Sequence, residues 1–270
     1  MDNNPIGIFD SGLGGLTAVK EIEKVLPKED IVYFGDTGRV PYGTKSALMI
    51  NKYTAQNVAF LKTLGVKVIL AACGTVSAVA QPNVKDCGVP YFDVIEPTVE
   101  AAIKSTKSGR IGVIATPTTV ASHAYTDRIL GKDKDIEVFE LACPLFVNLI
   151  ESGHTSSEDE ITRFIVEKSL EDMRLKNVDT LVLGCTHFPI IADTISEVVG
   201  SGVKLINSGR EAARELARFL QENDILNESG KEAEKSFFVS DNIVSFSNTA
   251  EIFLGHSIEG MTKRIHIEDY

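Results

Sequence analysis

Short apolar runs rich in valine and isoleucine alternate along the chain with segments whose apolar residues recur every three or four positions. The short runs predict β-strands, and the segments with the longer period predict amphipathic α-helices. Because strands alternate with helices, we expect an α/β fold with mostly parallel sheets. Strands are predicted at residues 6–9, 31–34, 66–72, 90–94, 111–115, 136–141, 180–183, 203–206 and 236–239. Helices are predicted at residues 16–25, 45–64, 96–104, 120–130, 145–150, 158–175, 189–199 and 210–223, with a short one that ends at residue 79.

Two parts of the sequence resemble each other. The motif IGIFDSGLGG at residue 6 matches IGVIATPTTV at residue 111, and IVYFGD at residue 31 matches IEVFEL at residue 136, the same interval along the chain. A third pair of stretches, around Cys73 and Cys185, follows in the same order. The matches predict a duplicated α/β unit, although similar short patterns also recur by chance in α/β proteins. We expect two pseudo-symmetric, flavodoxin-like units that face a central cleft, one formed by residues 1–97 and 208–270 and the other by residues 98–207.

Composition and charge narrow the classes of function. Hydrophobic residues make up 43% of the 270 residues and the net charge is −11, which favours a globular protein and argues against nucleic acid or an anionic membrane as partner. The N-terminal residues MDNNPIGIFD lack the basic and apolar regions of a secretory signal. No apolar run approaches the roughly 20 residues of a membrane span. We expect a cytoplasmic protein whose four cysteines stay reduced.

Polar or reactive side chains follow several predicted strands. Asp10, Cys73, Thr116 and Cys185 each lie where a strand ends. In open α/β sheets, ligands bind beyond the carboxyl ends of the strands. If the two units face each other, Cys73 and Cys185 line one cleft from opposite sides.

The two thiols are the strongest candidates for chemistry. Cys73 and Cys185 both precede a predicted helix, whose N–H groups favour the thiolate and lower the pKa of a cysteine. A single cysteine is more often a small buried hydrophobe, but a matched pair at two strand ends favours a functional role. His187 follows in the motif CTH, where it can lower the pKa of the thiol or deliver a proton. Cys-x-His without a second spaced pair is a weak metal signal, so no metal is predicted.

Three other stretches have a structural and a functional interpretation. In DSGLGGL, Asp10 and Ser11 can cap the next helix, while the stretch lacks the lysine of a phosphate-binding loop. PYG at residues 41–43 is a turn by default, though its backbone N–H groups can hold a carboxylate. By default, Glu151 is interpreted as a solvated residue at the end of a helix. The remaining cysteines and histidines are interpreted as structural: Cys87, Cys143, His123, His154, His256 and His266.

Taken together, the motifs resemble those of the glutamate racemases, a family within the aspartate/glutamate racemase superfamily. The matching pieces cover nearly the whole chain in family order. They are IGIFDSGLGGL, YFGDTGRVPYG, AACGTVSA, VIEP, IGVIATPTTVASHAY, CPLFVNLIESG, LVLGCTHFP, INSG and FLG.

The resemblance implies proton transfer at the α-carbon of glutamate without a cofactor, by a cysteine thiolate on one face and a protonated cysteine on the other. It implies Cys73 and Cys185 as this pair, acting on D- and L-glutamate respectively, with Asp10, His187 and Glu151 beside them. It also implies a role in peptidoglycan synthesis, and family members are often homodimers. Substrate contacts are implied for Asp10, Ser11, Tyr42, Gly43, Gly74, Thr75, Thr116, Thr119, Thr186 and His187.

The sequence departs from the family pattern in two places. Gly74 stands where most members have asparagine, and Asn207 stands where aspartate is common. Three alternatives remain at this point: a racemase or isomerase for aspartate or a hydantoin, a catalytically silent two-lobed amino-acid-binding protein, and a Cys/His hydrolase. The combination of DSGLGG, PYG and CTH favours glutamate over the other racemase substrates.

Overall fold

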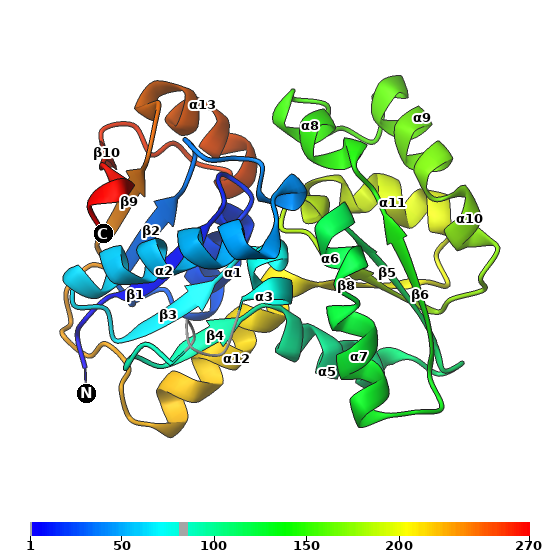
Figure 1. Ribbon diagram of the computed structural model, residues 1–270, viewed down its shortest axis with the longest axis horizontal. Coiled ribbons are helices and arrows are strands. Elements are labelled where there is room, and N and C mark those ends of the chain that lie inside the picture. Colours follow the sequence, from blue (N-terminus) through cyan, green and yellow to red (C-terminus); the bar gives the residue numbers. More distant parts are fainter. Residues whose placement is uncertain (1, 81–85) are drawn as a thin grey trace.

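A computed structural model describes residues 2–80 and 86–270 of the chain, which fold around two parallel β-sheets that lie side by side (Figure 1). We call each sheet with the helices packed on it a half. The sheet of the first half is formed by β1 (Ile6–Asp10), β2 (Ile31–Gly35), β3 (Val68–Ala71), β4 (Tyr91–Asp93), β9 (Lys235–Val239) and β10 (Thr262–Arg264). The sheet of the second half is formed by β5 (Arg110–Ala115), β6 (Glu137–Ala142), β7 (Thr180–Leu183) and β8 (Lys204–Asn207). The predicted α/β fold with mostly parallel sheets is confirmed.

The strand order repeats between the halves. The first sheet contains the order β2-β1-β3-β4 and the second has the order β6-β5-β7-β8. If the strands of each unit are numbered along the chain, both sheets place them in the order second, first, third, fourth. The pairing register refines the repeat seen in the sequence: Ile6 lies opposite Ile31, but Ile111 lies opposite Val138. Val138 therefore corresponds to Ile31, two residues further along than the sequence match had placed it.

Helices cover the sheets, as expected for strands that are buried on both faces. Those that follow strands of the first sheet are α1 (Leu16–Val25), α2 (Ala47–Thr63), α3 (Gly74–Val79), α5 (Ile95–Ser105) and α13 (Ile243–Leu254), with short 3-10 helices η1 (Tyr42–Thr44) and η3 (Ile267–Asp269). Those that follow strands of the second are α6 (Pro117–Ala121), α7 (Ala124–Lys132), α8 (Leu145–Glu151), α9 (Glu160–Ser169), α10 (Glu171–Arg174), α11 (Ala192–Val199) and α12 (Ser208–Glu222), with the 3-10 helix η2 (Phe188–Ile191).

The observed elements differ from the predicted ones in a few places. The helix predicted at 120–130 is two helices, α6 and α7, because His123 adopts a left-handed conformation with φ of 52° between them. The segment 158–175 is likewise divided into α9 and α10, and the predicted helix at 189–199 begins as η2. The sequence pattern missed α13, whose exposed apolar residues Ile243, Val244 and Ile252 obscure the periodicity, and β10, whose three residues are all polar.

The chain crosses between the halves through α5 and α12. After β8, α12 packs against both α1 and α5, and β9 and β10 then extend the first sheet. Asn207 caps α12, since its Oδ1 accepts a hydrogen bond from the backbone N–H of Arg210 at 3.1 Å. Aspartate and asparagine are equally good at this position, so the departure at Asn207 is structurally neutral. The division into domains at 97/98 and 207/208 stays a prediction, and its first boundary falls inside α5.

Within the described residues, no helix is long and apolar enough to span a membrane.

A buried ion pair lies beside the first sheet near the start of β3, at the end opposite Cys73. The side chains of Lys67 and Glu29 are 0% and 2% exposed, and Nζ lies 2.6 Å from Oε2. Lys67 Nζ also donates to the carbonyls of Asp2 at 2.8 Å and Ile225 at 2.7 Å, while Glu29 Oε1 accepts from the N–H of Asn227 at 2.8 Å. The pair therefore joins the N-terminal segment, β3 and the loop after α12.

We expect Lys67→Met to lower the free energy of unfolding by about 3–5 kcal/mol, because it leaves the Glu29 carboxylate buried without its partner. Urea denaturation measures the change. Arg218→Met is the matched control: it removes an exposed pair with Glu215, and such pairs contribute little to stability. Equal losses in the two variants would contradict the prediction.

Candidate functional site

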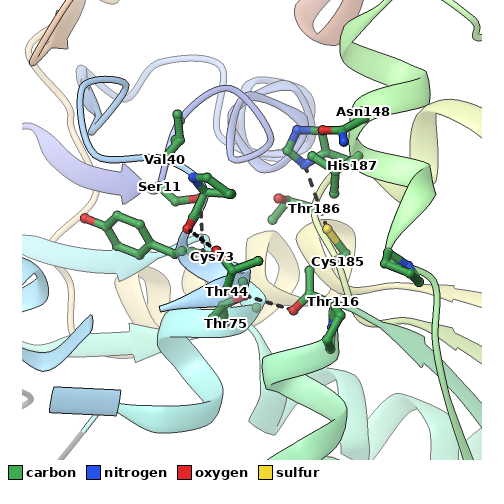
Figure 2. Close-up of a pocket in the computed structure, with 18 of the residues that line it drawn as sticks. Ser11, Val40, Thr44, Cys73, Thr75, Thr116, Asn148, Cys185, Thr186 and His187 are labelled. Atoms are coloured by element: carbon green, nitrogen blue, oxygen red, sulfur yellow. Dashed lines mark hydrogen bonds between the residues drawn. The ribbon is translucent and has the colours of Figure 1, made fainter. Parts of the chain in front are cut away.

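A cavity of about 340 Å³ lies between the two halves, where the carboxyl ends of both sheets meet (Figure 2). Cys73 enters it from the first half and Cys185 from the second. Its wall contains side chains from both halves and, among the described residues, no lysine or arginine. The lining residues predicted from the sequence are Ser11, Tyr42, Gly43, Cys73, Gly74, Thr75, Thr116, Glu151, Cys185, Thr186 and His187.

Cys73 occupies the turn between β3 and α3. It is the N-cap of α3 in extended conformation and is only 4% exposed. Its thiol donates to Ser11 Oγ at 3.7 Å. β3 ends two residues before Cys73 and α3 begins directly after it, so the sulfur lies in the cavity wall between these two elements.

The pKa of Cys73 is raised from 9.0 to about 12. Burial is the largest cause, and the carboxylate of Asp10 adds to it; hydrogen bonds from the backbone of Val76 and from Ser11 act in the opposite direction and do not compensate. The expectation that the helix N-terminus lowers the pKa of this thiol is therefore wrong. Desolvation exceeds the effect of a helix of six residues, and Cys73 carries its proton.

Cys185 lies beside an imidazole that is itself held by a carboxylate. Cys185 Sγ is 3.8 Å from His187 Nδ1, and His187 Nε2 is 2.9 Å from Glu151 Oε1. Burial lowers the pKa of His187, but the interactions with Cys185 and Glu151 prevail and raise it from 6.5 to about 10. His187 therefore places a positive charge next to the Cys185 sulfur, in contrast to the negative Asp10 near Cys73.

The first turn of α1 holds the loop that carries the second cysteine. Thr17 Oγ1 donates to the carbonyl of Thr186 at 2.8 Å, across the boundary between the halves. A Cβ atom at Gly14 would lie 2.2 Å from Thr186 Oγ1 and 2.5 Å from His187 Nδ1. The glycine in DSGLGGL is therefore required for this close approach, in addition to forming the turn that was predicted.

The backbones of the two cysteine segments also touch each other. A Cβ atom built on Gly74 would lie 2.4 Å from the carbonyl oxygen of Gly184, a separation that real Cβ atoms do not adopt. Gly74 directly follows Cys73 and Gly184 directly precedes Cys185. Because residue 74 is glycine and not asparagine, the two segments approach each other more closely than a side chain at this position would allow.

A row of threonine hydroxyl groups joins the halves along another wall. Thr75 Oγ1 lies 3.1 Å from Thr116 Oγ1, which lies 2.9 Å from Thr119 Oγ1. Nearby, Thr118 Oγ1 donates to the carbonyl of Gly43 at 2.5 Å. These contacts place hydroxyl groups from both halves at one polar wall.

Asp10 and Thr119 do not line the cavity themselves; both are buried behind it. One carboxylate oxygen of Asp10 accepts from the N–H of Gly12 at 2.9 Å, whereas Oδ1 is buried without a hydrogen-bond partner. Tyr42 lines the cavity, but its hydroxyl points into the first half and donates to Asp36. At residues 41–43 the backbone, rather than the tyrosine hydroxyl, is thus the part available to a ligand.

Some residues at the cavity were not singled out from the sequence. Cys143 was interpreted as structural, yet it is fully buried in the cavity wall directly after β6. The rule that identified the other strand ends would have found it. Thr17 carried no such signal, because its partner is far away in sequence. Further lining residues that pattern analysis missed are Gly12, Leu13, Val40, Pro41, Thr44, Pro117, Pro144, Val147, Asn148 and Gly184.

Comparison with known proteins gives consistent matches along the chain. A family model described as Asp/Glu/Hydantoin racemase matches residues 14–216. The glutamate racemase of Thermoanaerobacter pseudethanolicus is 43% identical over 270 residues, which is 100% of both chains, and that of Streptococcus gordonii is 44% identical over 261 residues, 96% of this chain and 97% of the relative. The structure of glutamate racemase from Francisella tularensis in complex with D-glutamate has a TM-score of 0.92 at 40% identity, with 100% of both chains covered.

We expect Glu151→Gln to lower the pKa of His187, because the carboxylate stabilises the imidazolium. With a folded-state pKa raised to about 10 from 6.5, the charged pair stabilises the fold fully below pH 6.5 and loses this contribution as the pH rises through about 10. Titration of the imidazole signals by NMR measures the shift.

Glu140→Gln is the matched control for this titration, since Glu140 pairs with the exposed His123 in the same way. It should leave the pKa of His187 unchanged. A pKa of His187 that stays the same in Glu151→Gln would contradict the prediction.

Proposed function

The chain belongs to the Asp/Glu/hydantoin racemase family, as its motifs predicted, and we propose that it interconverts L-glutamate and D-glutamate by proton transfer between Cys73 and Cys185 without a cofactor. The observation that carries the proposal is the arrangement of the two thiols. They follow corresponding strands, β3 and β7, and enter one cavity from opposite halves. The names of relatives with full-length coverage support glutamate as the substrate.

Inversion at the α-carbon requires two acid/base groups on opposite faces. One cysteine thiolate takes the α-proton, and the electron pair of the C–H bond remains on the substrate as a carbanion. The other cysteine then gives its proton to the opposite face and becomes the thiolate. After one turnover the protonation states of the two sulfurs are exchanged, so the reverse reaction restores them and no redox partner is needed.

The charges around the two thiols favour one of these protonation patterns at rest. Cys73 keeps its proton because its pKa is raised to about 12 by burial and by Asp10. The imidazolium of His187, 3.8 Å from Cys185 Sγ, favours negative charge on that sulfur. We therefore assign Cys185 as the base at rest and Cys73 as the acid. The family resemblance alone supports the further assignment of Cys185 to L-glutamate and Cys73 to D-glutamate.

Substrate binding rests on neutral donors and on buried carboxylates. Since the described lining has no lysine or arginine, we assign the substrate carboxylates to hydroxyl groups such as those of Ser11 and Thr75 and to backbone N–H groups at Gly43. Asp10 Oδ1 is buried behind the cavity wall without a hydrogen-bond partner among the described residues, so we propose that Asp10 acts on the substrate ammonium group by its charge and not by direct contact. Donors fixed around the cavity also stabilise the carbanionic transition state. We assign the remaining contacts to Tyr42, Gly74, Thr116, Thr186 and His187, and we assign Thr119 to holding the hydroxyl group of Thr116.

We further propose a cytoplasmic role that supplies D-glutamate for peptidoglycan. The peptidoglycan role is proposed on the family resemblance, whereas the compartment has chemical support: all four cysteines are free, and the mechanism requires both cavity thiols in reduced form. A reducing compartment keeps them so. A homodimer is proposed on the family resemblance alone.

Cys73→Ala and Cys185→Ala are each expected to abolish racemisation, because each leaves one face of the α-carbon without an acid/base group. Circular dichroism with either enantiomer, in deuterated water without cofactor, followed by mass spectrometry, measures inversion and α-deuteration. Cys87→Ala is the control, since Cys87 lies outside the cavity lining. Substantial racemisation by either single variant would exclude the two-thiol mechanism, and a wild-type protein without α-exchange would favour the silent binding protein.

Gly74→Ala is expected to lower kcat/KM for glutamate by about tenfold to a hundredfold, because displacing a reacting group by about 1 Å can have an effect of that size. The new methyl group cannot fit 2.4 Å from the Gly184 carbonyl, so the two cysteine segments must separate. Steady-state kinetics measures the loss. Gly202→Ala adds a methyl group in open space and should keep wild-type kinetics; an equally active Gly74→Ala would show that the contact is dispensable.

A further inference from the structure

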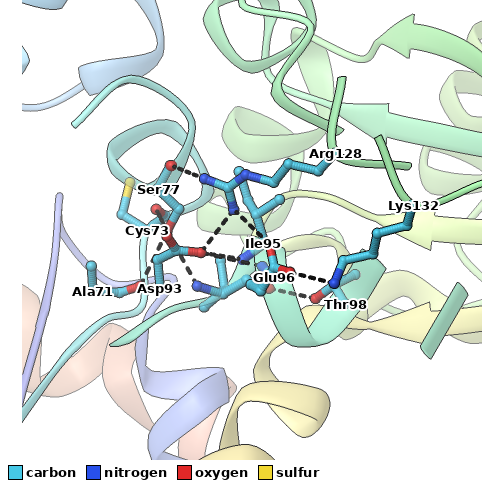
Figure 3. Close-up of polar contacts among 10 residues, drawn as sticks. Ala71, Cys73, Ser77, Asp93, Ile95, Glu96, Thr98, Arg128 and Lys132 are labelled. Atoms are coloured by element: carbon cyan, nitrogen blue, oxygen red, sulfur yellow. Dashed lines mark hydrogen bonds and ion pairs between the residues drawn. The ribbon is translucent and has the colours of Figure 1, made fainter. Parts of the chain in front are cut away.

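Arg128 reaches from the second half to two points of the first (Figure 3). It lies on α7, and its guanidinium donates from Nη1 to Asp93 Oδ1 at 3.1 Å and from Nη2 to the carbonyl of Ser77 at 3.4 Å. The side chains of Arg128 and Asp93 are 26% and 10% exposed, so the ion pair is partly shielded from water. None of these three residues lines the cavity.

Ser77 connects the guanidinium to the first cysteine. Its hydroxyl donates to the carbonyl of Cys73 at 2.9 Å and accepts from the N–H of Val94 at 3.3 Å, and the residue is 1% exposed. Cys73 and Ser77 are one turn of α3 apart. A group that binds the Ser77 carbonyl therefore holds α3, and Cys73 is the N-cap of this helix.

Asp93 connects the guanidinium to the start of α5, the helix through which the chain passes from the first half to the second. The same oxygen that accepts from Arg128 also accepts from the N–H groups of Ile95 at 3.0 Å and Glu96 at 3.2 Å. It thereby caps α5, the helix through which the chain leaves the first half. Nη1 of Arg128 also lies 4.0 Å from Glu96 Oε2. Asp93 and Ser77, which accept hydrogen bonds from Arg128, are thus both fixed to backbone that places α3 relative to the second half.

We propose that Arg128 is a positioning residue that holds α3, and with it Cys73, at the separation from Cys185 that proton transfer requires. The planar guanidinium suits this task because it binds two acceptors at once in fixed directions. A cation near the C-terminal end of α3 also interacts favourably with the helix dipole. The proposal rests on the racemase function, and it concerns Cys73 more than Cys185.

The same helix provides a matched control. Lys132, one turn after Arg128, pairs with Glu96 at 2.8 Å and Glu100 at 3.4 Å. It therefore also ties α7 to α5, but it contacts neither Ser77 nor Asp93 (Figure 3). A variant of Lys132 tests docking of the two helices without disturbing α3.

Arg128→Met is expected to lower kcat/KM by about tenfold to a hundredfold, with KM changed much less than kcat. Arg128→Lys should recover part of the loss, because an ammonium group keeps the charge without the two fixed directions. Lys132→Gln should keep wild-type kinetics. A wild-type rate in Arg128→Met, or the same loss in Lys132→Gln, would overturn the proposal.

Isotope effects distinguish positioning from a general loss of stability. In Arg128→Met, proton removal by Cys73 becomes slower, so the effect of α-deuterium on kcat/KM should rise with D-glutamate. It should not rise with L-glutamate, whose α-proton is taken by Cys185. Isotope effects that change equally in both directions would assign Arg128 a structural role only.

Alkylation of the thiols tests the proposal without turnover, so it separates this inference from the proposed function. Iodoacetamide should label Cys73 severalfold faster in Arg128→Met than in the wild type, while labelling of Cys185 stays the same, as followed by peptide mass spectrometry. Parallel changes at both thiols, or none, would overturn the proposal. Absent racemisation in the wild-type protein would instead refute the proposed function.

Discussion

The structure depends on one geometric constraint: two thiols from different sheets must reach the same small volume from opposite sides. Parallel strands bring their carboxyl ends to one side of a sheet, and the cavity lies where the carboxyl ends of the two sheets meet. At two points the halves approach so closely that a Cβ atom has no room: Gly74 lies against the carbonyl of Gly184, and Gly14 lies against the side chain of Thr186. The glycines are thus a consequence of bringing the sulfurs together.

The two thiols differ in their electrostatic surroundings even though the folds that present them correspond. Cys73 is buried near the carboxylate of Asp10, which raises its pKa, whereas Cys185 has the protonated His187 at hydrogen-bonding distance. A two-base reaction needs one sulfur with a proton and one without, at the same pH. Different neighbours at corresponding positions provide that difference, where identical neighbours would give the sulfurs the same protonation state.

Much of this arrangement follows from the sequence, because it depends on local patterns. The ends of β1, β3, β5 and β7 were predictable from apolar runs, and the residues after them were found to face the cavity or to lie just behind it. The sequence did not predict the balance between two opposing effects on the pKa of Cys73. The helix N-terminus, which lowers the pKa, is visible in the sequence, whereas the burial of the thiol, which raises it, is not. The break at His123 was missed for a similar reason, since the left-handed backbone there interrupts an otherwise helical pattern.

Contacts between the halves lay beyond sequence analysis altogether, and they explain how the site keeps its dimensions. The loop of Cys185 is held by Thr17 of the first half, through the carbonyl of Thr186, and the helix of Cys73 is held by Arg128 of the second half, through the carbonyl of Ser77. Each thiol therefore has, besides the side chains of its own half that touch it, a segment that is contacted by a side chain from the half that carries the other thiol. Separating the halves would remove both of these contacts at once.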